Sequence, residues 1–174
     1  FVDCSYNKIS SLIIPNDSTI RNIRCESNQL TSIDLAKCPN LSNINCENNL
    51  LEKLDFSNNP ILAYVSCENN SLETITFAPV MSKLYAIYCS GNNLKTLDLS
   101  SLQSLTKLEC YDNQIKEIDV SNTPLSDLDK EEKTSNPSTG YRFILYNYSS
   151  VYKLDFLHFN VYQSYFSFWR FFYL

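Results

Sequence analysis

The sequence predicts a solenoid, a fold in which short coils of similar sequence stack along one axis. Two columns of residues predict it, because each recurs at steps of 21, 21, 21, 22 and 21 residues. The first column consists of cysteines: Cys4, Cys25, Cys46, Cys67, Cys89 and Cys110. The second column follows three residues later and consists of asparagines: Asn7, Asn28, Asn49, Asn70, Asn92 and Asn113. A fixed period of this length is the signature of a repeat architecture, whose coils contact only their neighbours.

Each repeat contains two halves with the same spacing. In the third repeat the first half reads L-x-x-I-x-C over residues 41–46, and the second half reads L-x-x-L-x-F over residues 51–56. The alternation in each half predicts a short strand with one buried face. The interval between the two strands is too short for a helix of typical length and its turns. We therefore expect about six coils over residues 1–125, with two narrow parallel sheets, little or no helix and a nearly straight axis.

The consensus L-x-x-L-x-C-x-x-N-x-L-x-x-L-D-L-S resembles the bacterial-type leucine-rich repeats that are sometimes called IRREKO repeats. Those repeats are about 21 residues long and have nested halves, and the resemblance covers residues 1–125. It implies a leucine-rich-repeat solenoid, which convention places in the α/β class although this one is rich in strands. The sequence departs from the pattern at Thr76 and Ile13, which replace the Asp, and at Gly91, which precedes the fifth Asn.

The family also implies a function class. Related repeats are common in bacterial surface and secreted proteins and act mainly in protein or ligand binding. The resemblance therefore implies a binding scaffold with an extracellular or cell-surface location. The motif is specific for the fold but does not identify the partner.

The pattern is interrupted after residue 125. Residues 126–140 are charged and poor in large apolar groups, which predicts a solvated insertion loop. Residues 141–159 fit a degenerate terminal repeat, with Ile144 in the inward apolar slot and Tyr146 in the cysteine slot. The aromatic tail over residues 160–174 is compatible either with a hydrophobic cap or with out-of-frame translation. Because residue 1 falls inside a repeat, we expect the chain to be a fragment of a larger protein.

The cysteine column is interpreted as part of the core, because free cysteine behaves as a small buried hydrophobic residue. Stacked thiols that point the same way are badly oriented for a disulfide. No histidine or acidic residue shares the column, so a metal site is not predicted, and no cofactor is expected. Cys38 lies outside the column and is predicted to be the exposed thiol.

Two polar columns are interpreted as structural. The amides of the asparagine column can bridge backbone groups that would otherwise be buried without a partner. A row of aspartates recurs in the second half of the repeats and consists of Asp34, Asp55, Asp98 and Asp119. We expect these aspartates to support the coils by hydrogen bonding to neighbouring turns.

No set of residues predicts catalysis, so we expect a protein that is not an enzyme. His158 is the one histidine and lies outside the repeats, which leaves a histidine-dependent site without partners there. Residues 1–140 carry 11 basic and 18 acidic groups, a net charge of −7. This balance argues against nucleic-acid binding, which needs clustered Lys and Arg. No apolar run reaches the roughly 20 residues that cross a bilayer.

The outward positions of the first strands form the predicted binding surface. An acidic column there consists of Glu26, Glu47 and Glu68, which stand about 4.8 Å apart and could attract a cation or a basic partner. A group of tyrosines consists of Tyr64, Tyr85, Tyr88 and Tyr111. Exposed tyrosines are frequent hot spots of interfaces, and they also stack on sugars. The alternatives are a solvated acidic face and scattered surface tyrosines.

Three functions fit this sequence: a monomeric scaffold that binds a protein or glycan, a rigid spacer without a ligand, and a regulatory arm of an enzyme whose catalytic domain lies elsewhere. The binding scaffold is our prediction. The second strand repeats Asp at one slot, as a structural element should, whereas the first strand varies outward from repeat to repeat. Variation on a constant frame is what a recognition face requires.

Overall fold

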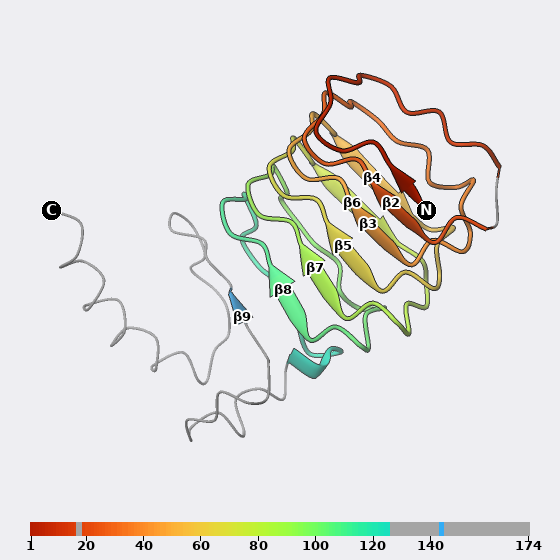
Figure 1. The fold of residues 1–174 in the computed structure, drawn as a ribbon. Coiled ribbons are helices and arrows are strands. Elements are labelled where there is room, and N and C mark those ends of the chain that lie inside the picture. The colour runs from red at the N-terminus through yellow and green to blue at the C-terminus, as the bar shows by residue number, and fades with distance from the viewer. Residues whose placement is uncertain (17–18, 126–142, 145–174) are drawn as a thin grey trace, which may run out of the picture.

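The structure is a computed structural model of the chain and describes residues 1–16, 19–125 and 143–144. These residues form a solenoid of stacked coils (Figure 1). Its regular elements are short parallel strands, and no α-helix occurs in the described ranges. No helix there is long and apolar enough to cross a membrane. The predicted β-rich solenoid is therefore confirmed.

Each coil contributes one strand to a seven-stranded parallel sheet. In spatial order its strands are β1 (Val2–Asp3), β2 (Asn22–Arg24), β3 (Asn43–Asn45), β5 (Tyr64–Ser66), β7 (Ala86–Tyr88), β8 (Lys107–Glu109) and β9 (Phe143–Ile144). The register between β2 and β8 places equivalent repeat positions opposite each other, so that Ile23 faces Ile44 and Ile44 faces Val65. The columns in the sequence are therefore columns in space.

The second sheet consists of two strands in the described part of the chain, β4 (Lys53–Phe56) and β6 (Thr74–Phe77). They pair in parallel with Phe56 opposite Phe77, and the two rings stack with centroids 6.0 Å apart. The strands occur in the two coils that carry Phe at this slot. The other coils have an aliphatic residue there and run beside their neighbours without strand pairing.

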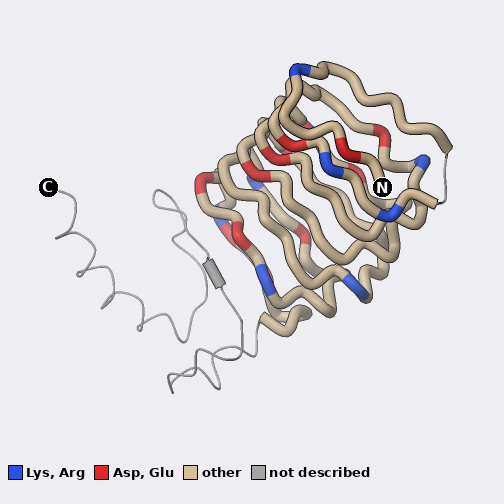
Figure 2. The backbone as a smooth tube through the Cα atoms, viewed as in Figure 1, with Lys and Arg blue, Asp and Glu red and all other residues tan. Residues whose placement is uncertain are grey.

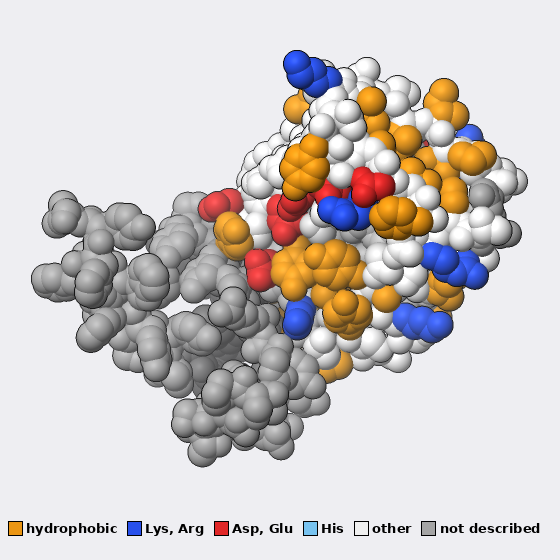
Figure 3. Space-filling model, viewed as in Figure 1, with side chains coloured by type: hydrophobic (Ala, Val, Ile, Leu, Met, Phe, Trp, Pro, Cys, Tyr) orange, Lys and Arg blue, Asp and Glu red, His pale blue; other side chains and the backbone are white. Residues whose placement is uncertain are grey.

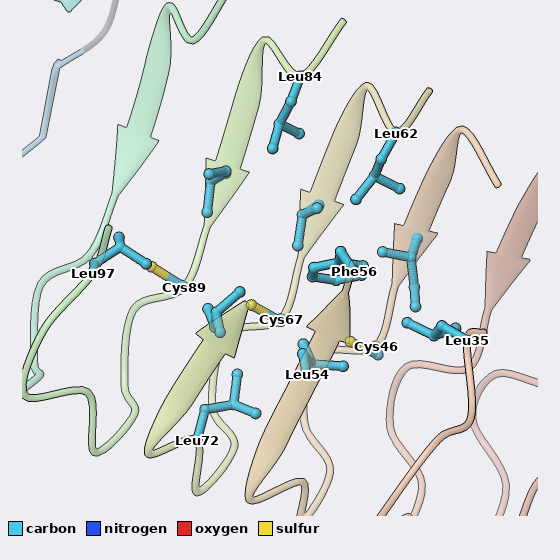
Figure 4. Packing of buried hydrophobic residues seen from close by; sticks show 14 of the residues in the cluster. Leu35, Cys46, Leu54, Phe56, Leu62, Cys67, Leu72, Leu84, Cys89 and Leu97 are labelled. Atoms are coloured by element: carbon cyan, nitrogen blue, oxygen red, sulfur yellow. The ribbon is translucent and has the colours of Figure 1, made fainter. Parts of the chain in front are cut away.

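The core lies between the two sides of the coil and is filled by the predicted inward residues (Figure 4). Cys46, Cys67 and Cys89 are fully buried and lie in a row at the ends of successive strands. Cys25 and Cys110 are buried as well, whereas Cys4, in the first described coil, is half-buried. Burial raises the pKa of the Cys25 and Cys110 thiols to about 12. The cysteine column is therefore part of the core, as predicted for all but Cys4.

Cys38 contradicts its prediction, because it is fully buried rather than exposed. Its N–H donates to the carbonyl of Leu35 at 3.0 Å, and its own carbonyl accepts from the N–H of Leu41 at 2.9 Å. This tight turn folds the side chain inward. The same turn recurs, with buried residues at the same position, at Asn59, Leu102 and Thr123. The members of this column differ in chemical type, so no sequence pattern marks it.

The asparagine column bridges the coils, as predicted. In the third coil the Asn49 side-chain amide donates to the carbonyls of Cys46 (3.1 Å) and Cys25 (3.0 Å), and its oxygen accepts from the N–H of Leu30 at 2.9 Å. Asn28, Asn92 and Asn113 make the same bonds and are buried, and Asn70 makes them while half-buried. Each of these five asparagines thus binds its own coil and the preceding coil, whereas the Asn7 amide donates within its own coil, to the carbonyls of Cys4 and Ser5.

The residue before each asparagine has a left-handed backbone, with φ between 52° and 67°. This column consists of Tyr6, Ser27, Asn48, Asn69, Gly91 and Asp112. Glycine adopts this conformation without steric cost, which explains the departure from the repeat at Gly91. The turn ends each strand and fixes where the outward side chains stand.

The prediction that the aspartate row hydrogen-bonds to neighbouring turns is wrong, because each aspartate bonds within its own coil. Asp55 accepts from the N–H and hydroxyl of Ser57, two residues later in the same coil. Asp34, Asp98 and Asp119 likewise accept from the N–H two residues on. These bonds lower the pKa of Asp55, Asp98 and Asp119. A short Asp side chain at a strand end reaches its own backbone more readily than the next coil.

Of the predicted terminal repeat the structure describes residues 143–144, whose register with β8 differs by one residue from the repeat pattern. Strand β9 pairs with β8 so that Leu108 lies opposite Phe143, whereas the repeat pattern placed Ile144 at that position. The predicted loop over residues 126–140, Tyr146 and the aromatic tail over residues 160–174 lie outside the described residues.

Candidate functional site

The candidate surface is the outward face of the seven-stranded sheet between β2 and β8, which we call the first-strand face. The central residue of each of these strands is buried against the core, for example Ile44, Val65 and Ile87. The residues on either side of it, and the residue two positions after each strand, therefore point away from the core. The register of the strands determines which outward residues lie next to one another, so the face is a regular grid of side chains.

Three of the four predicted tyrosines form a cluster on this face. Tyr64 lies opposite Ala86, and Tyr88 lies opposite Ser66, so the two tyrosines are diagonal neighbours. Their ring centroids are 5.6 Å apart, and the ring of Tyr85 is 6.4 Å from that of Tyr64. Tyr85 is 44% exposed, and the other two are half-buried. The rings are thus held against one another before any partner binds.

Tyr111 is half-buried and continues the diagonal two residues beyond β8. Ring contacts join Tyr64 to Tyr85 and to Tyr88. We define the tyrosine cluster as these three residues.

Glu47 and Glu68 stand in one column beside the cluster, and both are half-buried. The carboxylate of Glu68 accepts a hydrogen bond from the hydroxyl of Ser66 at 2.8 Å. Burial raises the pKa of Glu68, and the charges of Glu47 and Glu109 raise it further. In the described part of the chain none of these three glutamates forms an ion pair. Glu109, opposite Tyr88 on β8, was not among the predicted binding residues, although it lies in an outward column.

Glu26 does not extend this exposed acidic column, contrary to prediction, because it is 1% exposed. One of its oxygens accepts from Nη2 of Arg24 at 2.6 Å and from Nε at 3.2 Å. Arg24 also lies 3.8 Å from Asp3 on the neighbouring strand. The arginine two residues earlier on the same face thus covers and neutralises Glu26. The acidic column that remains accessible consists of Glu47 and Glu68.

Comparison with solved structures identifies the architecture. The structure of YopM, a leucine-rich effector protein from Yersinia pestis, superposes with a TM-score of 0.61 and 30% identity. The match covers 67% of this chain and 33% of YopM. This chain is a leucine-rich-repeat solenoid with bacterial-type repeats. The predicted repeat type is thereby confirmed, and the solenoid spans about a third of the length of YopM.

A second similar structure is the functional domain of InlJ from Listeria monocytogenes, which includes a cysteine ladder. It has a TM-score of 0.45 and 23% identity, and the match covers 69% of this chain and 36% of that domain. No family model matches the sequence, and a search of curated proteins gives no match.

Charged and hydrophobic side chains of the leucine-rich-repeat solenoid are arranged in distinct zones. Acidic residues of successive coils lie in a row beyond the strand ends (Figure 2). Hydrophobic side chains, including tyrosine, gather over the middle strands of the seven-stranded sheet, directly beside acidic side chains (Figure 3). An aromatic patch next to unpaired carboxylates favours contact with a partner that offers both apolar and cationic groups.

The described part of the solenoid also has a small pocket away from the first-strand face. A pocket of about 100 Å³ lies on the second side of the coils and is lined by Leu97, Asp98, Leu99, Ser100, Asp119 and Asn122. Binding pockets for small molecules are about 300–1,000 Å³. Among the described residues, no group of three or more His, Cys, Asp or Glu could hold a metal ion. The first-strand face, which carries the tyrosine cluster and the accessible carboxylates, is our candidate functional site.

Proposed function

We propose that this solenoid is a non-catalytic scaffold that binds a protein partner through the first-strand face. The observation that carries the proposal is the tyrosine cluster, in which Tyr64 contacts both Tyr85 and Tyr88. It lies beside carboxylates that form no ion pair with another described residue. Clustered tyrosines supply large rigid contact area at low entropic cost and are enriched among interface hot spots.

The frame around the cluster supports the same function. The hydrogen bonds of the asparagine column and the buried core repeat from coil to coil, so the backbone under the face is held at fixed spacing. Side chains on this rigid frame need little reordering on binding, which lowers the entropic cost of association. The similarity to an effector protein with leucine-rich repeats agrees with a binding scaffold.

Three further features belong to this proposal. The scaffold acts outside the cell or at a cell surface, as its repeat type and its similarity to an effector protein favour. It acts as a monomer, and its partner is a protein, with a glycan as the competing ligand.

The test compares variants of the chain with a partner captured from the native environment, identified and then purified. Tyr88→Ala should weaken binding by about 2 kcal/mol, the range of an interface hot spot. Replacing Glu47 and Glu68 by Gln should reduce the dependence of the association rate on salt. Tyr6→Ser is the matched control for loss of a tyrosine, because Ser27 occupies the same slot in the next coil.

Circular dichroism before and after heating would show whether each variant keeps the fold. If folded Tyr88→Ala and the glutamate variant bind the partner as the wild type does, the first-strand face is not the contact surface. The spacer function would then be favoured. Binding of purified glycans, with no protein partner captured, would replace the protein by a glycan ligand.

A further inference from the structure

We propose that Tyr88, Glu68, Glu109 and Ser90 form a subsite for an arginine side chain of the partner. This inference rests on the proposed function, because it uses the same face and names the chemistry that the face recognises.

Tyr88 stands at the centre of the grid with a carboxylate on either side. It lies opposite Ser66 on β5 and opposite Glu109 on β8. Glu68 follows Ser66 by two residues, which makes it a diagonal neighbour of Tyr88. Burial raises the pKa of the Tyr88 hydroxyl, and the charges of Glu109 and Glu68 raise it further, so both carboxylates are close enough to affect it. The ring face, itself electron-rich, is therefore flanked by two negative charges.

Three polar groups around Tyr88 lack a partner that a cationic ligand could supply. Neither Glu68 nor Glu109 forms an ion pair with another described residue. The hydroxyl of Ser90, which is 2% exposed, has no hydrogen-bond partner in the structure. Ser90 follows Tyr88 by two residues on the outward side and shares the column of Glu68. A buried hydroxyl without a partner costs free energy, and an N–H donor from a ligand would satisfy it.

The side chains that surround Tyr88 on the outward face are small, and this determines the shape of the subsite. The strand neighbours of Tyr88 on the outward side are Ala86 and Ser90, and Ser66 lies opposite it. These three side chains are small and buried, so the ring and the two longer carboxylate side chains lie over them. A flat group can therefore lie along the ring of Tyr88 and reach Glu68 or Glu109.

The chain already binds a guanidinium elsewhere on this face. Arg24 occupies the same position in its strand as Tyr88 does in β7. Its guanidinium lies between Glu26, at 2.6 Å, and Asp3 on the neighbouring strand, at 3.8 Å. The face can thus hold an arginine between carboxylates of adjacent strands. At Tyr88 the positions of Glu26 and Asp3 are occupied by Ser90 and Ser66. The carboxylates come instead from the coils on either side, as Glu68 and Glu109, and no described residue supplies the arginine.

Arginine suits these groups better than lysine. Its planar guanidinium stacks on an aromatic ring and offers five N–H donors in a rigid fork, whereas lysine has a compact and strongly hydrated charge. The two carboxylates and the hydroxyl can accept from the N–H donors of the guanidinium, and the ring can stack on its plane. A lysine would satisfy the charge alone.

The experiment titrates isotope-labelled chain with three capped pentapeptides and follows its NMR spectrum. The peptides are identical except for a central arginine, lysine or citrulline. The arginine peptide should shift the signals of Tyr88, Glu68 and Ser90, with a dissociation constant about tenfold lower than that of the citrulline peptide. The lysine peptide should bind several-fold more weakly than the arginine peptide, because it cannot stack or form a fork.

Variants separate the local subsite from the general acidity of the chain. Glu68→Gln combined with Glu109→Gln should raise the dissociation constant of the arginine peptide about tenfold. Glu73→Gln combined with Glu117→Gln removes the same charge from exposed positions in the second halves of the repeats and should change it less than twofold. Tyr88→Leu should weaken binding, while Tyr88→Phe keeps the ring and should preserve most of it.

Equal binding of the arginine and citrulline peptides would overturn the proposal. Equal binding of the arginine and lysine peptides, or an equal effect of the two pairs of glutamate variants, would overturn it as well, because either result indicates a general attraction of cations. If the peptides fail and Tyr88→Ala still weakens binding of the partner, the arginine subsite is wrong and the proposed function stands. If the arginine peptide binds as expected and the partner ignores the face, the proposed function is wrong.

Discussion

The side-chain amide of Asn49 donates a hydrogen bond to the backbone carbonyl of Cys25, 3.0 Å away in the preceding coil. The same NH₂ group donates to the carbonyl of Cys46 in its own coil, and the amide oxygen accepts from the N–H of Leu30. One side chain therefore satisfies backbone groups of two coils at the turn where strand pairing ends. The stack depends on this amide, because buried backbone groups without a partner are costly.

Asn49→Ala should destabilise the solenoid by about 3 kcal/mol, because it leaves several buried backbone groups without a partner, each worth about 1–3 kcal/mol. Urea denaturation followed by circular dichroism would measure the loss. Asn58→Ala is the matched control, since Asn58 is exposed and forms no side-chain hydrogen bond with described residues, and should cost less than about 0.5 kcal/mol. If Asn49→Ala lowers the free energy of unfolding no more than the control does, the asparagine column does not stabilise the stack.

Reactivity of the thiols should follow burial. The thiolate is the reactive form, and burial raises the pKa of Cys46, Cys67 and Cys89 well above the ordinary value. In native chain at pH 8, iodoacetamide should therefore modify half-buried Cys4 first among the cysteines. Cys38 should be protected like the others, since it is fully buried. Peptide mass spectrometry at increasing times would measure this order, and rapid native labelling of Cys38 would show that its turn opens.

The fold could be predicted because its columns repeat the same chemical type. Cysteine and asparagine at one spacing mark the inward slot and the bridging slot, and these residues occupy those places. The column of Cys38, Asn59, Leu102 and Thr123 carries the same turn with four kinds of side chain. No pattern of residue type marks it, so the burial of Cys38 could not be read from the sequence.

The candidate face could be predicted in outline, because alternation along a strand determines which side chains point outward. Its details depend on pairs of neighbours. Glu26 is buried because Arg24 lies beside it, whereas Glu47 and Glu68 have no arginine at that position. Likewise the aspartates bond to their own turns because Ser or Ala follows two residues later with an N–H in reach. These local contacts depend on the geometry of neighbouring side chains and not on the repeat period of the sequence.

Gly91→Ala should destabilise the solenoid by about 1–2 kcal/mol, because φ at Gly91 is +67° and a left-handed backbone disfavours a side chain. A Cβ atom there would also stand 2.6 Å from Oδ1 of Asn69 in the preceding coil. The cost should therefore be smaller in an Asn69→Ala background, by about 0.5–1 kcal/mol. Thermal unfolding of the four chains of this double-mutant cycle measures the coupling, and strict additivity would show that the two residues do not meet.

The charge of Glu68 should destabilise the folded chain at neutral pH. Burial raises the pKa of Glu68 in the folded state, with Glu47 and Glu109 adding to the effect, whereas the unfolded chain leaves the carboxyl in water. The folded state then binds the proton more readily. The contribution of Glu68 to stability should therefore rise as the pH falls through the folded pKa, and level off below the unfolded value near about pH 4.

Glu68→Gln should accordingly stabilise the solenoid at pH 7, by about 0.5 kcal/mol, since solvent screens a half-exposed group. The difference between variant and wild type should shrink toward zero as the pH falls to about 4. Glu73→Gln, which removes an equal charge from an exposed position, should give no such pH-dependent difference. Urea denaturation of the three chains between pH 4 and pH 8 would measure this. A destabilised Glu68→Gln at pH 7 would mean that the hydrogen bond from Ser66 outweighs the cost of burying the carboxylate.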